Sequence, residues 1–332
     1  MLSLRKLFVV LVLATLLLSG CGGDAVEDDV FRVAVIMPSG INDLAFSQSI
    51  YDSVRIIQDE MGGPDFMQFV YSENMFVVDD AAAAIRDYAA EGYDLIIAHG
   101  SQYGSSLREI APDFPTTSFA HGTTADTFVE LGINNVFAYE AASDEGGFVN
   151  GMIATMMTQS GVVGVVGPIE TGDAQLYVDG FVAGVRASDP DVQVNVNYIG
   201  SFSDVALAAE AANTHVQAGA DVMAGTAQMV VGAIGVARDN DVYWIGTQAS
   251  QTSLAPDHVL ANQIYDWAVV LRDIIAQIED GVYGGKAYVI TLANQGQVME
   301  YNTNVIPPEV LEAARATEQG LIDGTISTGV RQ

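Results

Sequence analysis

A carboxylate, an amide and an aromatic ring follow one another closely in the turn at residues 38–49. Asn42, Asp43 and Phe46 supply these groups, and Ser47 adds a hydroxyl directly after the ring. A carboxylate and an amide can pair with the polar edge of a flat molecule while a ring stacks on its face. The turn therefore predicts a binding site for a planar polar compound. The alternative is structural: Asp43 caps the following helix and Phe46 fills the core.

The turn lies between two segments with clear periodicity. Residues 33–37 form the unbroken apolar run Val-Ala-Val-Ile-Met, which is typical of a buried strand. In residues 47–61, four apolar side chains recur at helical spacing: Ile50, Val54, Ile57 and Met61. In an open α/β sheet, such a turn lies at the carboxyl end of its strand, which is where ligands are held.

Further amide, carboxyl and aromatic side chains follow the ends of later predicted strands. Their polar groups could bind the edge of a heterocycle, and their rings offer stacking of about 0.5–1.5 kcal/mol beyond the buried area. Each of these rings could instead lie in the core. This alternative includes Trp267, which stands at a predicted helix start. The complete set of predicted ligand-binding residues is Asn42, Asp43, Phe46, Ser47, Gln102, Tyr103, Gln248, Asp266 and Trp267.

From Phe31 onward, strand and helix patterns alternate with short glycine-rich joints, which indicates a parallel α/β architecture. The pattern starts again near the middle of the chain, so we predict two similar α/β lobes. The first comprises residues 31–138 plus about 264–332, and the second comprises residues 139–263. A chain that recrosses between two lobes forms a hinge, and hinged lobes can close over a ligand.

The first 21 residues have the pattern of a secretory signal. Arg5 and Lys6 precede an apolar run at 7–18, which is too short for a comfortable membrane span. Cys21, the only cysteine, follows Leu-Ser-Gly as in a bacterial lipobox, so we predict that it becomes the lipidated first residue. Residues 22–30 then form a small, acidic tether. The alternative is an ordinary signal peptide with a stray cysteine.

The charge balance is strongly acidic, with 42 acidic against 12 basic residues and a net charge of −30. Such a surface repels phosphate backbones and offers no counterion release, which excludes nucleic acid as a partner. Acidic, lysine-poor surfaces are also used by halophiles. We therefore hypothesise a saline habitat, and a stability that failed to rise with salt would contradict it.

Signals of catalysis are weak. The four histidines lack the spacing of metal ligands, and the glycine-rich segment at 161–172 matches neither phosphate-binding nor dinucleotide-binding motifs. With Cys21 assigned to the anchor, the mature chain has no reactive cysteine. We predict a binding protein without cofactor or metal, and not an enzyme.

Several ordered blocks of the sequence resemble the basic membrane protein family, also called the purine nucleoside receptor type. Its members are lipoprotein substrate-binding components of ABC transporters. The resemblance implies a type I periplasmic-binding-protein fold, with two doubly wound lobes that close on a purine nucleoside or related base. It also implies an extracytoplasmic protein that delivers its ligand to an ABC permease; we expect a monomer. The blocks are the lipobox and residues 43–49, 145–151, 198–204 and 217–222.

Two departures from the family pattern bear on the ligand. Asp43 and Phe46 match the first family motif, although Ser47 replaces its asparagine. Where nucleoside binders typically show Gly-Val-Asp-Ser-Asp, residues 246–250 read Gly-Thr-Gln-Ala-Ser, and a lysine expected near 265–267 is missing. The lost acid would accept the ribose hydroxyls. This chain therefore looks more like the family members that bind bare bases or other small heterocycles than like the nucleoside binders.

Three rival functions remain open from the sequence. Related two-lobe proteins take sugars, and aromatic side chains suit sugar faces as well. A surface-tethered nucleoside hydrolase would need a nucleophile or metal constellation, which the sequence does not offer. A sensory lipoprotein would hand its bound form to a receptor in place of a permease.

Overall fold

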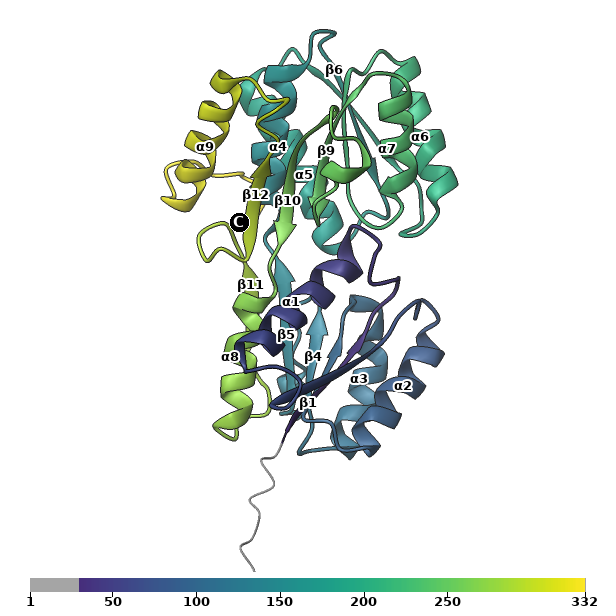
Figure 1. Cartoon of the computed structure of the whole chain (residues 1–332), viewed down its shortest axis with the longest axis vertical. Helices are drawn as coiled ribbons and strands as arrows, with labels where there is room; N and C mark the ends of the chain where they lie inside the picture. The colour runs from purple at the N-terminus through teal and green to yellow at the C-terminus, as the bar shows by residue number, and fades with distance from the viewer. Residues whose placement is uncertain (1–29, 332) are drawn as a thin grey trace, which may run out of the picture. The chain divides into compact units, whose positions relative to one another are not determined.

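Two parallel sheets lie at the centres of two lobes in the computed structural model, which describes residues 30–331 (Figure 1). The first sheet has the order β11-β5-β4-β3-β1-β2, and all of its neighbouring strands are parallel. Its strands are β1 (Phe31–Ile36), β2 (Met67–Ser72), β3 (Leu95–Ala98), β4 (Ser118–Gly122), β5 (Val136–Ala141) and β11 (Ala287–Ile290).

The second sheet repeats this topology. Its order is β12-β10-β9-β8-β6-β7, and the edge strand β12 alone among these pairs runs antiparallel, against β10. The sequence prediction of two doubly wound α/β lobes is thus confirmed. The strands are β6 (Val162–Gly167), β7 (Gln193–Tyr198), β8 (Val222–Gly225), β9 (Tyr243–Gln248), β10 (Val259–Tyr265) and β12 (Gln297–Tyr301).

Helices cover both faces of each sheet, so the inner strands are apolar on both sides. In the first lobe, α1 (Phe46–Glu60) and α8 (Ala268–Glu279) cover one face, and α2 (Val78–Ala90) and α3 (Gly104–Ile110) the other. In the second lobe, α4 (Ser143–Met157), α5 (Gly172–Ser188) and α9 (Pro308–Ile322) lie opposite α6 (Val205–Gln217) and α7 (Val230–Asp239). Single 3₁₀ turns are η1 (Ser101–Tyr103), η2 (Ala111–Asp113), η3 (Val129–Leu131) and η4 (Thr252–Leu254).

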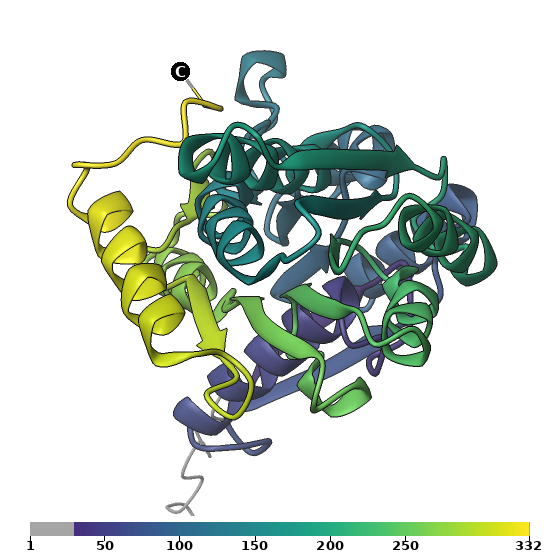
Figure 2. The same ribbon diagram turned by 90° about the horizontal axis from the view of Figure 1, so that it is seen from above.

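The chain passes between the lobes three times, after β5, after β10 and after β11. The prediction that residues 264–332 all return to the first lobe is therefore wrong beyond β11. Strand β12 pairs with β10, and α9 packs beside α4 in the second lobe (Figure 2). The reason is that β12 extends the edge of the second sheet and α9 covers the apolar face of α4.

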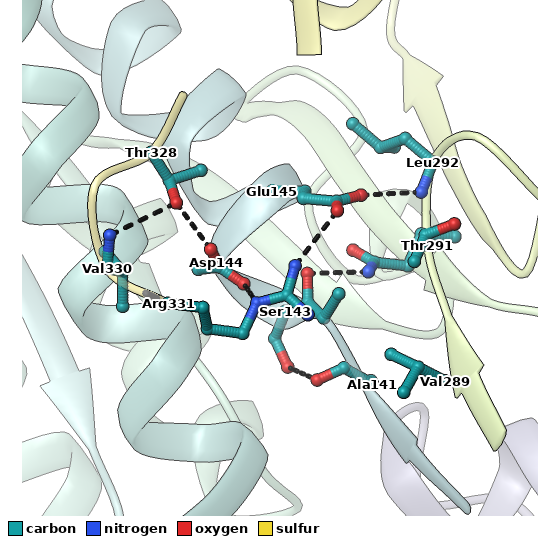
Figure 3. A network of polar contacts seen from close by, with 12 residues as sticks. Ala141, Ser143, Asp144, Glu145, Val289, Thr291, Leu292, Thr328, Val330 and Arg331 are labelled. Atoms are coloured by element: carbon teal, nitrogen blue, oxygen red, sulfur yellow. Dashed lines mark hydrogen bonds and ion pairs between the residues drawn. The ribbon is translucent and has the colours of Figure 1, made fainter. Parts of the chain in front are cut away.

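The C-terminal segment contacts both the crossover after β5 and the crossover after β11 (Figure 3). Arg331 lies 2.6 Å from the buried carboxylate of Asp144 and 3.0 Å from Glu145, both in the first turn of α4. Glu145 also accepts a hydrogen bond from the backbone N–H of Leu292, and Thr328 donates to Asp144. These contacts join the start of α4, the segment after β11 and the chain end.

Helices α4 and α5 approach at backbone distance through glycines. A Cβ atom on Gly151 would lie 2.1 Å from the carbonyl oxygen of Phe181, and one on Gly184 would lie 2.1 Å from that of Phe148. The glycines of the 145–151 block thus serve close helix packing. This packing fixes α5, whose first turn reaches the space between the lobes.

Candidate functional site

The turns that follow the parallel strands of both lobes surround a pocket of about 310 Å³. This volume is at the lower end of the range for small-molecule sites. The pocket lies outside the carboxyl ends of the strands, as expected for doubly wound sheets. Its lining comprises Pro38, Phe46, Phe76, Gly100, Ser101, Gln102 and Thr123 from the first lobe, and Thr171, Gly172, Asp173, Ala174, Phe202, Ala227, Gln228 and Gln248 from the second.

The ring of Phe46 is supported from behind by a buried histidine. The rings of Phe46 and His99 stack with centroids 3.8 Å apart and an angle of 14°. The Nε2 atom of His99 lies 3.1 Å from the Phe46 carbonyl oxygen, and Nδ1 lies 2.7 Å from the hydroxyl of Tyr139. Because a carbonyl only accepts, Nε2 carries the proton, and Nδ1 accepts from Tyr139. Burial lowers the pKa of His99 to about 3, so the ring is neutral and holds Phe46 in place.

Asp43 organises its own turn and does not line the pocket. Its carboxylate accepts hydrogen bonds from the backbone N–H groups of Ala45, Ser47 and Gln48, at 2.9–3.0 Å, and from the hydroxyl of Ser39. Asp43 is a predicted ligand contact, and the structure shows its carboxylate bonded within its own turn, as in the structural alternative. The physical reason is that the free N–H groups at the start of α1 already satisfy both carboxylate oxygens.

Two other members of that turn also lie outside the pocket lining. The Ser47 side chain is fully buried, with its hydroxyl 2.7 Å from that of Ser39. Asn42 is exposed to solvent. Both residues are predicted ligand contacts; the structure places Ser47 in the turn scaffold and Asn42 outside the lining of this pocket.

The predicted aromatic contacts Tyr103 and Trp267 are core residues. Both side chains are fully buried, and neither lines the pocket. The hydroxyl of Tyr103 donates to the carbonyl of Met75 at 2.9 Å, and Nε1 of Trp267 donates to Ser49 at 2.9 Å. Each ring is thus buried with its polar group satisfied inside its own lobe.

Asp266 stands at the start of α8 and accepts a hydrogen bond from the backbone N–H of Ala268 at 3.0 Å. Asp266 is a predicted ligand contact, and the structure places it outside the pocket lining. Its carboxylate serves as a helix cap. Of the nine predicted residues, the structure places three in the pocket lining: Phe46, Gln102 and Gln248.

An acidic side chain lines the pocket from the second lobe. Asp173 is the second residue of α5, and only 5% of it is exposed. Within residues 30–331, its Oδ2 atom has no hydrogen-bond partner. Burial raises the pKa of Asp173 to about 8, although the backbone of Ala141 acts to lower it. The carboxyl group is therefore poorly solvated and available to a ligand.

Gln248 presents another side-chain atom without a partner. It ends β9 with a positive φ of 73°, a conformation that non-glycine residues adopt rarely. The side chain is 4% exposed, and its Oε1 atom finds no partner in the described part of the chain. Asp173 and Gln248 together give the second lobe two buried polar atoms without partners at the pocket.

Comparison with known proteins identifies the family. The model of the Bmp family, described as ABC transporter substrate-binding protein PnrA-like, matches residues 30–331. The chain belongs to this family. Its members are extracytoplasmic substrate-binding proteins that work with an ABC permease, and they are not enzymes. The resemblance found in the sequence is confirmed.

Relatives at low identity carry several different names. The transcriptional activator protein Med of Bacillus subtilis is 27% identical over 81% of this chain and 82% of its own. A purine-binding protein of Brucella abortus is 25% identical over 96% of this chain and 88% of its own. A putative ABC transporter glucose-binding protein of Haloferax volcanii is 24% identical over 91% and 75%.

Solved structures share the fold. An ABC transporter solute-binding protein from Conexibacter woesei superposes with a TM-score of 0.73 at 22% identity, covering 90% of this chain and 98% of that one. At this identity the likeness concerns the architecture alone. It agrees with the periplasmic-binding-protein fold that the sequence predicts.

Sequence reasoning did not select several lining residues. Phe76, Asp173, Phe202 and Gln228 each follow the end of a strand, like the residues that were selected. Asp173 had the clearest available signal, because residues 162–174 repeat the order of strand, small-residue turn, acid and helix found at 31–46. The two rings follow edge strands, β2 and β7, which carry no strong apolar pattern.

The lining contains no Lys, Arg, His or Cys. In the part of the chain that the structure describes, no group of three or more His, Cys, Asp or Glu side chains could hold a metal ion. Over the same residues, no helix combines the length and apolar character needed to cross a membrane. The arrangement offers stacking and hydrogen bonding to a small uncharged or donor-rich molecule.

Proposed function

We propose that this protein captures a purine base, a nucleoside or a similar small heterocycle for an ABC transporter. The observation that supports this most directly is the composition of the pocket. Phe46 of the first lobe and Phe202 of the second both line it, together with the amides of Gln102, Gln228 and Gln248. Rings offer faces for stacking a flat ligand, and amides both donate to and accept from its edge.

Capture works by closure of the two lobes. The pocket takes residues from both, so a ligand completes its contacts only when the lobes are close together. Such a ligand binds the closed form more tightly and shifts the population toward it. The permease then receives the closed, loaded form.

The anchoring of the protein is part of the proposal. Cys21 and the preceding lipobox lie outside the described residues, and their pattern supports a lipid-anchored protein on the outer side of a membrane. Mass spectrometry of the membrane-extracted protein tests this. A mature chain that starts at a diacylated Cys21 is the expected result, and a chain that starts elsewhere without lipid contradicts it.

The ligand is tested by isothermal titration with adenine, hypoxanthine, guanosine and D-glucose, after unfolding and refolding to remove any bound compound. We expect at least one purine to bind with a Kd in the micromolar range or tighter. The similarity to a purine-binding protein of Brucella abortus supports this expectation. Binding of glucose without binding of any purine would overturn the proposal.

Sugar capture is the second candidate, favoured by the similarity to a putative glucose-binding protein of Haloferax volcanii. Aromatic faces also stack on sugar rings. The same titration separates the two candidates, because a pocket of about 310 Å³ holds one small ligand at a time. Competition between glucose and a purine would show that both use this pocket.

A further inference from the structure

The second lobe brings two buried polar atoms to the pocket without hydrogen-bond partners. Oδ2 of Asp173 and Oε1 of Gln248 have no hydrogen-bond partner within residues 30–331, and both side chains are at least nine-tenths buried. A buried polar group that stays unpaired destabilises the protein. Two such atoms in one small pocket therefore indicate that the ligand supplies their partners.

Building on the function proposed above, we propose that Asp173 is a specificity-determining residue that selects heterocycles with an exocyclic amino group. Once ionised, the Asp173 carboxylate only accepts, so it pairs with one hydrogen of an amino group, and the second hydrogen can go to Oε1 of Gln248. A ring carbonyl in the same place would bring an acceptor against the ionised carboxylate. Gln248 can turn its amide to present either a donor or an acceptor, so Asp173 sets the preference.

Within residues 30–331, no Lys or Arg side chain lines the pocket beside Asp173. Arg331 is near enough to lower the pKa of Asp173 slightly, yet its guanidinium is engaged by Asp144 and Glu145. Glu140 acts in the opposite direction. Among neighbours that titrate, Tyr139 and Tyr265 stay neutral, because burial raises the pKa of both hydroxyls.

The geometry at the start of α5 keeps the carboxyl group in position. Gly172 precedes Asp173 with a φ of 54°, and the glycine contacts between α4 and α5 hold the first turn of α5 at the cleft. The backbone of Ala141, at the first crossover, lies close enough to the carboxyl group to lower its pKa. Asp173 thus lies where both lobes meet, and a ligand that pairs with it also contacts the first lobe.

Buried groups that go unpaired are known to reject analogues far more strongly than apolar contacts do. We therefore expect the amino member of a matched purine pair to bind at least tenfold more tightly than its oxo counterpart at pH 8, where Asp173 begins to ionise. The pairs are adenine with hypoxanthine, and guanosine with inosine. Because the amino group pairs with the ionised carboxylate, the affinity for the amino compound should rise from pH 6 to pH 8.

The experiment is isothermal titration of both pairs with the wild-type protein and with the Asp173→Asn and Gln228→Met variants, at pH 6 and pH 8. Asn keeps the shape and removes the charge, so we expect the amino preference to fall below threefold and the pH effect to vanish. Gln228 lines the same pocket, and its replacement should change both members of a pair alike. Circular dichroism and thermal melting check that each variant is folded.

Each outcome bears on a different statement. An amino preference that disappears in Asp173→Asn alone supports the assignment. Purines that bind the wild type without amino preference, or a preference that survives in Asp173→Asn, overturn the assignment and leave the proposed function standing. If no purine binds the folded wild type, the proposed function fails and the assignment fails with it.

Discussion

Asp43 of the first lobe and Asp173 of the second lobe stand at matching points of the topology. Each follows the strand at which the sheet order reverses, β1 or β6, and each lies at the start of the next helix. Asp43 accepts four hydrogen bonds within its own turn. Asp173 is more deeply buried, with one carboxylate oxygen unpaired toward the pocket.

The difference lies in the backbone before each helix. In the first lobe, Asp43 precedes α1 by three residues, so the helix's free N–H groups point back at its carboxylate. In the second lobe, Asp173 is itself the second residue of α5, and its Oδ2 atom has no hydrogen-bond partner within residues 30–331. The carboxylate of Asp43 is therefore part of its turn scaffold, whereas that of Asp173 is available to a ligand.

The largest expected effect is a difference in the pH dependence of stability. An unfolded Asp ionises above about pH 4, while folded Asp173 stays protonated up to about pH 8. The unfolded state thus binds fewer protons between these values, and stability falls as the pH rises through this window. The stabilisation that comes from keeping folded Asp173 protonated is fully present below about pH 4. It is on the order of 5 kcal/mol at most.

Urea unfolding at pH 5, 6, 7 and 8 measures this slope. Asp173→Asn should be less pH-sensitive than the wild type over this range, because the other titrating groups are common to both proteins. Equal slopes for the two proteins would mean that Asp173 is ionised and solvated, and the contrast with Asp43 would be lost.

Removal of the scaffold carboxylate should cost stability outright. Asp43→Ala leaves three backbone N–H groups and the Ser39 hydroxyl without their acceptor. We expect a loss of about 2–4 kcal/mol in the free energy of unfolding, since bonds to charged groups contribute more than neutral ones. The control is Asp52→Ala on the exposed side of α1, which should change stability by less than about 0.5 kcal/mol. Equal losses in the two variants would contradict the scaffold role.

A change in the packing of α5 should move Asp173 without touching Asp43. A Cβ atom on Gly184 would lie 2.1 Å from the carbonyl of Phe148, so Gly184→Ala must push α5 away from α4. We expect a loss of about 1–3 kcal/mol in stability and weaker ligand binding. Gly235→Ala in α7 meets nothing within 4 Å and is the control. A variant of Gly184 with wild-type stability would show that the helices do not pack this closely.

The smallest effect concerns the ring in the first lobe. Phe46→Leu keeps an apolar side chain on His99 and removes the aromatic face, so affinity for a heterocycle should fall by about two- to tenfold, from the loss of 0.5–1.5 kcal/mol of stacking. Phe46→Ala should exceed tenfold, because burial is lost too. Leu254→Ala, outside the pocket lining, should leave the affinity unchanged. Unchanged affinity in both Phe46 variants would remove this residue from the site.

Predictions from the sequence are least certain for residue types that occur both in pockets and in cores. Tyr103 and Trp267 follow strand ends as a ligand-binding ring would, yet both are buried in the first lobe with satisfied polar groups. The direction of a side chain at a turn depends on the local backbone, which periodicity does not specify. The return of β12 and α9 to the second lobe was missed for a similar reason, since pairing partners far apart in the chain leave no local pattern.

By itself the sequence determined the local order of strand, turn and helix, because apolar periodicity and small-residue turns are properties of neighbouring residues. That order is enough to give the α/β class and the edge of the sheets at which a ligand is held. Only the tertiary structure decided that Asp43 is satisfied and Asp173 is not. Burial and the supply of hydrogen-bond donors depend on segments brought together by folding, such as Ala141 at the first crossover beside the start of α5.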